Sequence, residues 1–352
     1  MTDRFASLAK GPRRRLRPAP HPAWVAPMFA TLTDRRFSDQ GWLYERKLDG
    51  QRCLVFRHGP DVRLLSRRQH DLSATYPEVA DAFAAQEADD LVVDGEVVAF
   101  HGGHTSFARL QQRMGNNDAA RARRSPVAVV FYAFDLLHLD GHDTTGLPLR
   151  DRKGLLRRTL RSVGPLRYTP HRNGTGTAYF AVACARGWEG LIAKRADAPY
   201  IGRRSDAWLK YKCAAGQEMV VGGYTDLAGS RVGFGALLVG YYDGDDLVYA
   251  GKVGTGYTTA VLLDLRRRLG ERAVERSPFT RGRVEERRPH WVHPELVAQV
   301  AFTEWTTDGK LRHPRFEGLR EDKAPREVRR EQPGGAATTQ PGRSSAPRPT
   351  TR

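Results

Sequence analysis

The chain has 352 residues, of which 40% are apolar and 28% are charged. This composition predicts a globular protein of two domains, and it argues against a membrane protein because no apolar run reaches the length of a transmembrane helix. With 57 Lys and Arg against 40 Asp and Glu, the net charge of +17 favours a polyanionic partner, most commonly nucleic acid. Charge alone does not separate DNA from RNA or from an acidic membrane surface.

The first segment of the chain is basic and proline-rich. Residues 1–22 lack the apolar core of a secretion signal, so we expect a flexible arm on a cytoplasmic protein. A mixed pattern follows. Strands are expected at 41–46, 61–67, 91–100 and 126–137 from their β-branched and apolar runs, and helices at 76–88, 149–161 and 178–187 from their apolar spacing.

The composition of the sequence changes near residue 215, where short predicted strands and many glycines begin. Residues 215–328 are typical of a small antiparallel barrel. The last segment, 329–352, is rich in Pro, Gly, Ser and Thr, and we expect it to be disordered because it has too few apolar side chains to offset its ordering entropy. The sequence therefore predicts an α+β fold with domains at 23–214 and 215–328.

Neither the cysteines nor the paired histidines have the spacing of a metal site. Cys53, Cys184 and Cys213 are far apart, and we expect three buried, reduced thiols. The HGGH segment at 101–104 and the HWVH segment at 290–293 lack further ligands nearby, which favours a loop and packing over metal binding.

The segment YERKLDGQR carries the strongest chemical signal. In an extended strand, residues two apart share a face, so we expect Lys47 beside Glu45 and Asp49. Gly50 permits a turn or a close backbone approach, and Arg52 offers a planar fork for a phosphate or a carboxylate. The lysine suits covalent nucleotidyl transfer if nearby cations, a metal ion or burial lower its pKa. An exposed, ion-paired turn is the alternative, since a lone match to this pattern is only suggestive.

Five further segments supply what a nucleotidyl-transfer pocket needs. An aromatic face sandwiches a base, carboxylates hold a ribose hydroxyl and a metal ion, and lysines neutralise an α-phosphate under attack. The candidates are Ser66 and Arg67 in SRRQHD, Asp94 and Glu96 in VVDGEVVAF, Phe134 and Asp135 in FYAFDLLHLDG, Glu189 and Lys194 in EGLIAKR, and Lys210 and Lys212 in WLKYKC.

In this order, the segments resemble the covalent nucleotidyltransferases, and specifically the ATP-dependent DNA ligases. The resemblance covers roughly residues 26–328. Residues 302–328 and the SFARLQQRMG segment at 106–115 are similar to parts of bacterial end-joining ligases. No polymerase or nuclease module is visible, so we expect a stand-alone ligase.

The resemblance implies a role for each matching residue. Lys47 matches the lysine that carries AMP, Glu45 the contact to adenine N6, and Phe134 the ring that stacks on adenine. The other matches are Glu96 for ribose and metal, Glu189 for metal, Lys194, Lys210 and Lys212 for phosphate, Arg320, Asp322 and Lys323 for orienting the leaving pyrophosphate, and Asp49, Gly50, Arg52 and Arg67 for the same nucleotide site.

The resemblance also implies the activity and the architecture. It implies an ATP-dependent DNA ligase that seals 5′-phosphate/3′-hydroxyl breaks through lysyl-AMP and a DNA-adenylate, with Mg²⁺ or Mn²⁺, in DNA repair, recombination or replication. An adenylation domain of antiparallel sheets and helices would precede an OB-fold barrel. The substrate would be nicked or broken double-stranded DNA and the partner a Ku-type end-binding protein. We expect a monomer in the bacterial cytoplasm, associated with the nucleoid.

Three alternatives stay open from the sequence. An RNA-capping guanylyltransferase shares K-x-D-G and an OB domain, and an RNA ligase shares the lysine pocket. Residues 302–328 and the FDLLHLDG segment favour a DNA ligase over both. A non-catalytic DNA-binding scaffold would explain the charge, but it predicts the loss of at least one pocket residue, and every expected position is filled.

Overall fold

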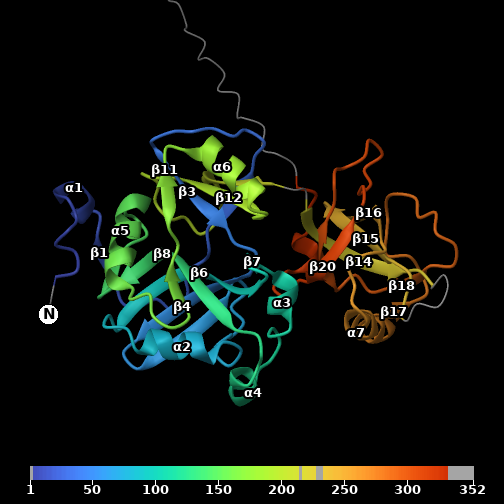
Figure 1. Ribbon diagram of the computed structural model, residues 1–352, viewed down its shortest axis with the longest axis horizontal. Coiled ribbons are helices and arrows are strands. Elements are labelled where there is room, and N and C mark those ends of the chain that lie inside the picture. Colours follow the sequence, from blue (N-terminus) through green and yellow to red (C-terminus); the bar gives the residue numbers. More distant parts are fainter. Residues whose placement is uncertain (1–2, 214–215, 227–232, 332–352) are drawn as a thin grey trace, which may run out of the picture.

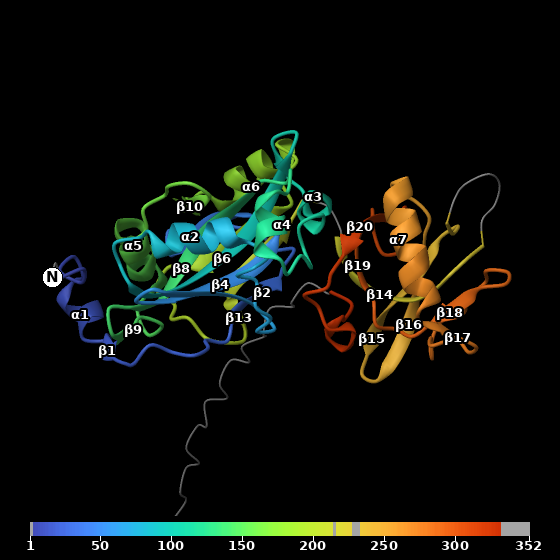
Figure 2. The same ribbon diagram turned by 90° about the horizontal axis from the view of Figure 1, so that it is seen from below.

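The computed structural model describes residues 3–213, 216–226 and 233–331 of the chain (Figure 1). Two units lie side by side along the long axis, and the perpendicular view in Figure 2 shows the same separation. The boundary expected at residue 215 and most of the tail expected at 329–352 fall outside the described residues. Among the residues that are described, no helix is long and apolar enough to cross a membrane.

Two mostly antiparallel sheets form the first unit. The eight-stranded sheet has the order β1-β9-β8-β6-β4-β5, with β10 beside β8 and β7 beside β6, and the five-stranded sheet has the order β11-β3-β12-β13-β2. The strands are β1 (Arg17–Pro18), β2 (Phe29–Leu32), β3 (Trp42–Lys47), β4 (Gln51–His58), β5 (Asp61–Ser66), β6 (Asp90–His101), β7 (His104–Thr105), β8 (Val129–Leu139), β9 (His142–Asp143), β10 (Leu166–Tyr168), β11 (His171–Asn173), β12 (Gly190–Arg195) and β13 (Arg204–Lys212). The helices are α1 (Lys10–Arg13), α2 (Pro77–Ala84), α3 (Phe107–Gln111), α4 (Ala119–Arg123), α5 (Leu149–Thr159) and α6 (Gly176–Ala185).

The eight-stranded sheet is buried on both faces, as the long apolar runs of β6 and β8 predict. Successive residues of a strand point to opposite faces, so one strand serves two layers. Val55 of β4 packs in the core that includes residues of α2 and α5. Its neighbours Leu54 and Phe56 pack on the opposite face with Trp208 of the five-stranded sheet. The space between the two sheets is therefore where their polar side chains meet.

The second unit is a seven-stranded antiparallel sheet with the order β16-β15-β14-β18-β17, with β19 beside β14 and β20 beside β19. Its elements are β14 (Gly216–Tyr224), β15 (Leu237–Asp243), β16 (Asp246–Val253), α7 (Thr259–Gly270), β17 (Ala273–Val274), β18 (His290–Val292), β19 (Val297–Ala301), β20 (Arg315–Leu319) and the 3₁₀ turn η1 (Pro325–Glu327). The hydroxyl of Thr258 caps α7 by accepting from the Val261 N–H. Leu262, Leu265 and Leu269 then bury one face of α7 in the core.

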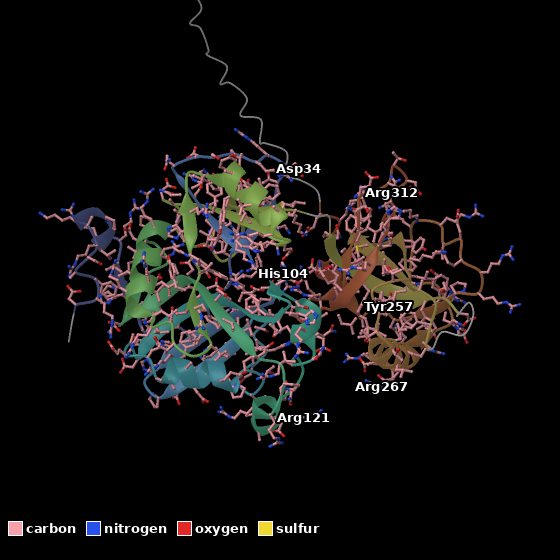
Figure 3. All side chains as sticks on the ribbon, in the orientation of Figure 1. Asp34, His104, Arg121, Tyr257, Arg267 and Arg312 are labelled. Atoms are coloured by element: carbon pink, nitrogen blue, oxygen red, sulfur yellow. A yellow bond between two sulfur atoms is a disulfide. The ribbon has the colours of Figure 1, made fainter. Side chains whose placement is uncertain are left out.

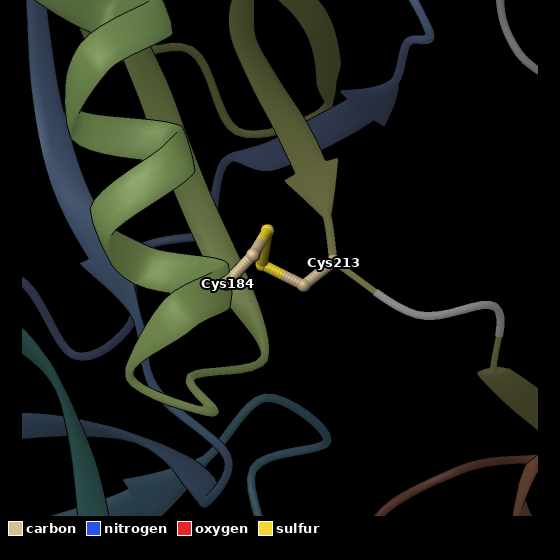
Figure 4. Close-up of a disulfide and its surroundings, with 2 residues drawn as sticks. All are labelled: Cys184 and Cys213. Carbon is tan, nitrogen blue, oxygen red and sulfur yellow. A yellow bond between two sulfur atoms is a disulfide. The ribbon is translucent and has the colours of Figure 1, made fainter.

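Two expectations about the first unit are wrong. The described part of residues 1–22 packs on the domain: Phe5 and Leu8 are buried in its core, and β1 pairs with β9. Cys184 and Cys213 form a disulfide that joins α6 to the end of β13, and only Cys53 is a free, buried thiol (Figure 4). The sequence hid both features because each depends on contacts between segments that are distant along the chain.

Basic side chains project from both units. Figure 3 shows Arg121 on α4, Arg267 on α7 and Arg312 on a loop of the second unit at the periphery of the molecule. All three are exposed. Two of them are ion-paired, Arg267 with Asp264 and Glu271 and Arg312 with Glu304, so exposure alone does not make their charge free for a polyanion.

Candidate active site

A cavity of about 220 Å³ lies between the two sheets of the first unit and extends to the second unit. The candidates Ser66, Asp94 and Asp135 do not line it, whereas every residue that the family resemblance assigns to the site does. These residues are Glu45, Lys47, Asp49, Gly50, Arg52, Arg67, Glu96, Phe134, Glu189, Lys194, Lys210, Lys212, Arg320, Asp322 and Lys323. The cavity is therefore assembled from strand ends of both sheets together with one segment of the second unit.

Lys47 is the last residue of β3, and β12 begins opposite it, with Gly190 as its register partner. The Lys47 amine donates to Glu189 Oε2 at 2.6 Å. Burial disfavours the charged amine, but the attraction of Glu189, Asp49 and Glu96 outweighs it, so the pKa of Lys47 is raised. A lowered pKa, as the sequence led us to expect, does not describe the ligand-free protein.

Position 50 has room only for glycine. A β-carbon here would lie 2.2 Å from the carbonyl oxygen of Val97 and 2.7 Å from a methyl carbon of Val98, closer than real contacts allow. Glycine thus lets the connection between β3 and β4 pass directly against β6. The consequence is that Lys47 and Glu96, which lie on different sheets, face the same cavity.

The carboxylates beside Lys47 lie close together and are partly buried. Burial, together with the charge of Glu189, raises the pKa of Asp49 to about 7, and burial raises the pKa of Glu96 to about 8. Among the described residues, these carboxylates do not form a preassembled group of three metal ligands. Mg²⁺ is usually held by one or two carboxylates together with substrate phosphates, so the donor set fits that ion.

The other half of the cavity is aromatic. The rings of Phe134 and Trp208 lie edge to face at 6.1 Å, and the Lys194 amine stands 4.3 Å and 4.0 Å from their respective centroids. Lys194 also pairs with Glu45 at 2.7 Å, and Lys153 donates to the same carboxylate at 2.5 Å. Burial opposes ionisation of Glu45, but the two lysines hold its pKa below the usual range. Lys194, which we expected at a phosphate, therefore lies at the aromatic end.

Two arginines predicted to bind the nucleotide have protein partners. The guanidinium fork of Arg52 engages both carboxylate oxygens of the fully buried Asp94 and lies 4.7 Å from the ring centroid of Phe134. Arg67 donates to the backbone carbonyl of Asp322 at 3.0 Å and so joins the first unit to the second. Arg52 therefore supports the aromatic wall, and Arg67 holds the two units together.

Lys210 and Lys212 lie on one face of β13 and share a single carboxylate. Lys212 pairs with Glu331 Oε2 at 2.7 Å, and Lys210 pairs with the other oxygen. Burial and the neighbouring amine lower the pKa of Lys210 to about 8. The pKa of Glu331 falls to about 2 despite burial, because Lys212 and Lys210 stabilise its charge. Glu331 thus occupies the place where the sequence leads us to expect phosphate.

The second unit contributes a cationic segment that follows β20. Arg320 donates two hydrogen bonds to Asp322, both at 2.9 Å, and its guanidinium carbon lies 4.6 Å from the ring centroid of Phe107. Lys323 pairs with Glu218 at 2.8 Å. The carboxylate of Asp322 thus orients Arg320, and acidic side chains of both units line the cavity that it faces.

Sequence reasoning missed three residues of the cavity region. Trp208 lies two positions before Lys210 on the same strand, so strand periodicity would have found it. Lys153 lies within α5, and its contact with Glu45 depends entirely on packing between the helix and the five-stranded sheet. Glu331 belongs to a segment whose composition indicates disorder, and composition carries no signal of such a contact.

The fold and the cavity define a two-domain nucleotidyltransferase. Two family models match the chain: "ATP dependent DNA ligase domain" at residues 27–212 and "ATP dependent DNA ligase C terminal region" at residues 230–323. The chain belongs to the ATP-dependent DNA ligase family. The α+β fold, with an adenylation domain followed by an OB-fold domain, is confirmed.

Two curated relatives and one solved structure are similar to the chain over most of its length. The chain is 37% identical over 324 residues to the multifunctional non-homologous end joining protein LigD of Pseudomonas aeruginosa, covering 90% of this chain and 38% of that protein. It is 40% identical over 314 residues to the LigD DNA repair protein of Mycobacterium tuberculosis, covering 87% and 40%. A solved mycobacterial DNA ligase D complexed with ATP and MES has a TM-score of 0.65 and 37% identity, covering 87% of this chain and 98% of that one. The chain thus spans less than half the length of these curated relatives.

Proposed function

We propose that this chain seals 5′-phosphate/3′-hydroxyl breaks in double-stranded DNA in three steps that begin with ATP. The observation that carries the proposal is Lys47, which lies within an acidic cluster and faces a cationic segment from the second unit. The aromatic half of the same cavity suits a base, with Phe134 as its stacking surface and Glu45 as its acceptor. The family and the ATP-bound relative support ATP as the nucleotide.

In the first step, the Lys47 amine loses its proton and its lone pair forms a bond to the α-phosphorus of ATP. The bond from that phosphorus to the bridging oxygen breaks, and pyrophosphate leaves with the electron pair. A divalent cation at Glu96 and Glu189 would neutralise charge on the phosphates. Such a cation would also offset the charge of Glu189 and Glu96, which raises the pKa of Lys47, and so would favour loss of the Lys47 proton.

In the later steps, AMP passes to the 5′-phosphate of a break and is then displaced by the 3′-hydroxyl. Both steps need the lysyl-AMP cavity to open toward DNA. The contacts that join the units here, such as the one between Arg67 and the Asp322 backbone, would have to be released. The exposed Arg121 is an example of a basic side chain that is available for the DNA backbone.

Nick sealing tests the proposal directly. Purified protein with ATP and Mg²⁺ is expected to convert a nicked DNA duplex into a sealed strand, measured on a denaturing gel. Labelling of the protein by GTP but not by ATP would indicate a capping enzyme. Sealing of a nicked RNA duplex in place of the DNA duplex would indicate an RNA ligase. Absence of sealing together with absence of protein labelling by α-labelled ATP or GTP would support the non-catalytic scaffold instead.

We also propose the biological setting from the relatives. Two LigD proteins are named for non-homologous end joining, so double-strand-break repair in the bacterial cytoplasm, with a Ku-type partner and a monomeric ligase, is our proposal for this chain. Sealing of linear duplex ends is expected to rise when Ku is added. A pull-down without association, combined with unchanged sealing, would remove Ku from the proposal.

Arg320 is expected to act only in the first step, the formation of lysyl-AMP. Arg320→Ala should slow formation of lysyl-AMP by about 10²–10³-fold, because a preorganised cation that faces the leaving phosphates is lost. Sealing of a nick that already carries AMP should change far less. Arg326→Ala is a matched control, since Arg326 is an exposed arginine of the same segment. Equal losses in the two assays would show that Arg320 supports the fold rather than the first step.

Glu331 is expected to compete with ATP. Glu331→Gln should lower the KM for ATP in the labelling reaction by about fivefold, because it frees Lys210 and Lys212 from a carboxylate worth roughly 1 kcal/mol. The maximal rate should change little. Glu327→Gln is the control, because Glu327 pairs with Arg67 outside the lysine pair. A KM that rises in Glu331→Gln would contradict this assignment.

A further inference from the structure

Four side chains with metal-binding chemistry meet at one end of the eight-stranded sheet. Asp90 begins β6, His138 lies near the end of β8, and His58 ends β4, so the three occupy neighbouring strands at the same end. His58 and Asp90 are direct register partners. His21 reaches the same point from the segment that precedes β2. None of these residues lines the nucleotide cavity.

We propose that His21, Asp90 and His138 bind a divalent transition-metal ion of the zinc class, with His58 as the fourth ligand. One ligand atom from each of the first three lies within 4.8 Å of the others. His21 Nδ1 stands 2.7 Å from Asp90 Oδ1, and His138 Nε2 stands 3.1 Å from Asp90 Oδ2. Tetrahedral ligand atoms with bonds of about 2.0–2.2 Å lie about 3.3–3.5 Å apart, so a small outward movement admits the ion.

The fourth position is also present. His58 Nδ1 lies 3.5 Å from Asp90 Oδ1, and its ring centroid is 5.0 Å from that of His21. The side chain of His58 is 67% exposed, whereas that of His138 is 1% exposed. The site therefore has a buried side that fixes its geometry and an open side for entry. Three imidazoles and one carboxylate favour zinc, cobalt or nickel over magnesium or calcium, which prefer oxygen ligands.

The ring nitrogens of His138 have different surroundings. Nε2 faces Asp90, whereas Nδ1 has no hydrogen-bond partner within the described residues. His138 would bind an ion through Nε2 in the tautomer that carries its proton on Nδ1.

The ion would fasten a segment that lacks regular secondary structure. Residues 19–28 run from a hydrogen bond between Ala19 and Gly141 to Met28, whose carbonyl accepts from Arg52 of the nucleotide cavity wall. A metal that joins His21 to three strand ends would hold this segment against the sheet. Binding to the folded state alone raises its stability, so the ion should raise the melting temperature of the first unit.

Metal binding by the full chain without a histidine tag tests the proposal. After treatment with a chelator and dialysis, the protein is titrated with Co²⁺ followed by its visible absorption, and with Zn²⁺ in competition with a chromophoric chelator. One equivalent with a tetrahedral cobalt spectrum is expected. Affinity should fall at least tenfold in His21→Gln and in Asp90→Asn, and His104→Gln, on the exposed HGGH loop, should leave it unchanged.

The variants also separate this site from the nucleotide cavity. Glu96→Gln removes a carboxylate of the cavity and should leave the cobalt spectrum intact. Binding that survives His21→Gln but disappears in Glu96→Gln would place the ion in the cavity and overturn the proposal. Absence of binding by the wild-type chain would overturn it as well. His58 is exposed, so His58→Gln should weaken metal binding without unfolding the protein. This variant therefore distinguishes the loss of a ligand from misfolding.

Discussion

Lys47→Ala is expected to abolish labelling of the protein by α-labelled ATP, with a loss on the order of 10⁴-fold or more, as is usual when a nucleophile is removed. The wild-type label should be acid-labile, because a phosphoramidate bond to an amine is hydrolysed in acid. Labelling is measured on a denaturing gel after incubation with ATP and Mg²⁺. Lys47→Arg should also be inactive, since a guanidinium keeps its proton and cannot attack phosphorus.

Sealing of a nick that already carries AMP distinguishes loss of the nucleophile from loss of the fold. Lys47 forms its bond only in the first step, so Lys47→Ala should retain a measurable part of this reaction. A matched control is Lys252→Ala, whose amine is 60% exposed and pairs with Glu286 on the second unit. Persistent labelling of Lys47→Ala would move the nucleophile to another side chain and remove the central assignment.

Arg152→Met is expected to lower the free energy of unfolding of the first unit by about 3–5 kcal/mol. Arg152 and Asp135 are both fully buried, and two hydrogen bonds of 2.7 Å and 2.9 Å join them. Arg152 also donates to the carbonyls of Leu147 and Ala198. Removing the arginine leaves a buried carboxylate without its counter-charge, which costs more than the lost hydrogen bonds alone. Urea unfolding followed by tryptophan fluorescence measures the change.

A second variant tests whether the buried charge is the cause. Asp135→Asn combined with Arg152→Met should recover part of the loss, because no unpaired charge stays in the core. Arg267→Met, at an exposed ion pair on α7, should leave the unfolding midpoint nearly unchanged. If the double variant loses as much free energy of unfolding as the two single variants together, the cost comes from packing and not from charge.

Much of the fold follows from local pattern. The strands expected at 61–67, 91–100 and 126–137 correspond to β5, β6 and β8, and the helices expected at 76–88 and 149–161 correspond to α2 and α5. Apolar periodicity and turn residues are local signals, and here tertiary packing does not oppose them. The buried N-terminal residues and the disulfide escaped prediction because neither leaves a local signal.

The order of the motifs predicted the candidate site residues, but it did not predict which side chains pair with them. Lys47, Glu96 and Arg320 were expected in one pocket, and the structure brings them together. Arg52 offers a fork for a phosphate or a carboxylate, and the structure pairs it with the carboxylate of Asp94. A side chain can pair with any of several partners of opposite charge. Which pair forms depends on distances in the folded structure, and the spacing of residues in the sequence does not give those distances.

The sequence by itself determined the α+β class, the family resemblance and part of the cavity lining, because these rest on residue type, order and periodicity. Only the tertiary structure decided the protonation of Lys47, the contact of Glu331 with the paired lysines and the meeting of His21 with Asp90 and His138. Each of these depends on electrostatic or coordination distances of a few ångströms between segments far apart in the chain. Such distances are fixed by packing, and packing is a property of the whole fold.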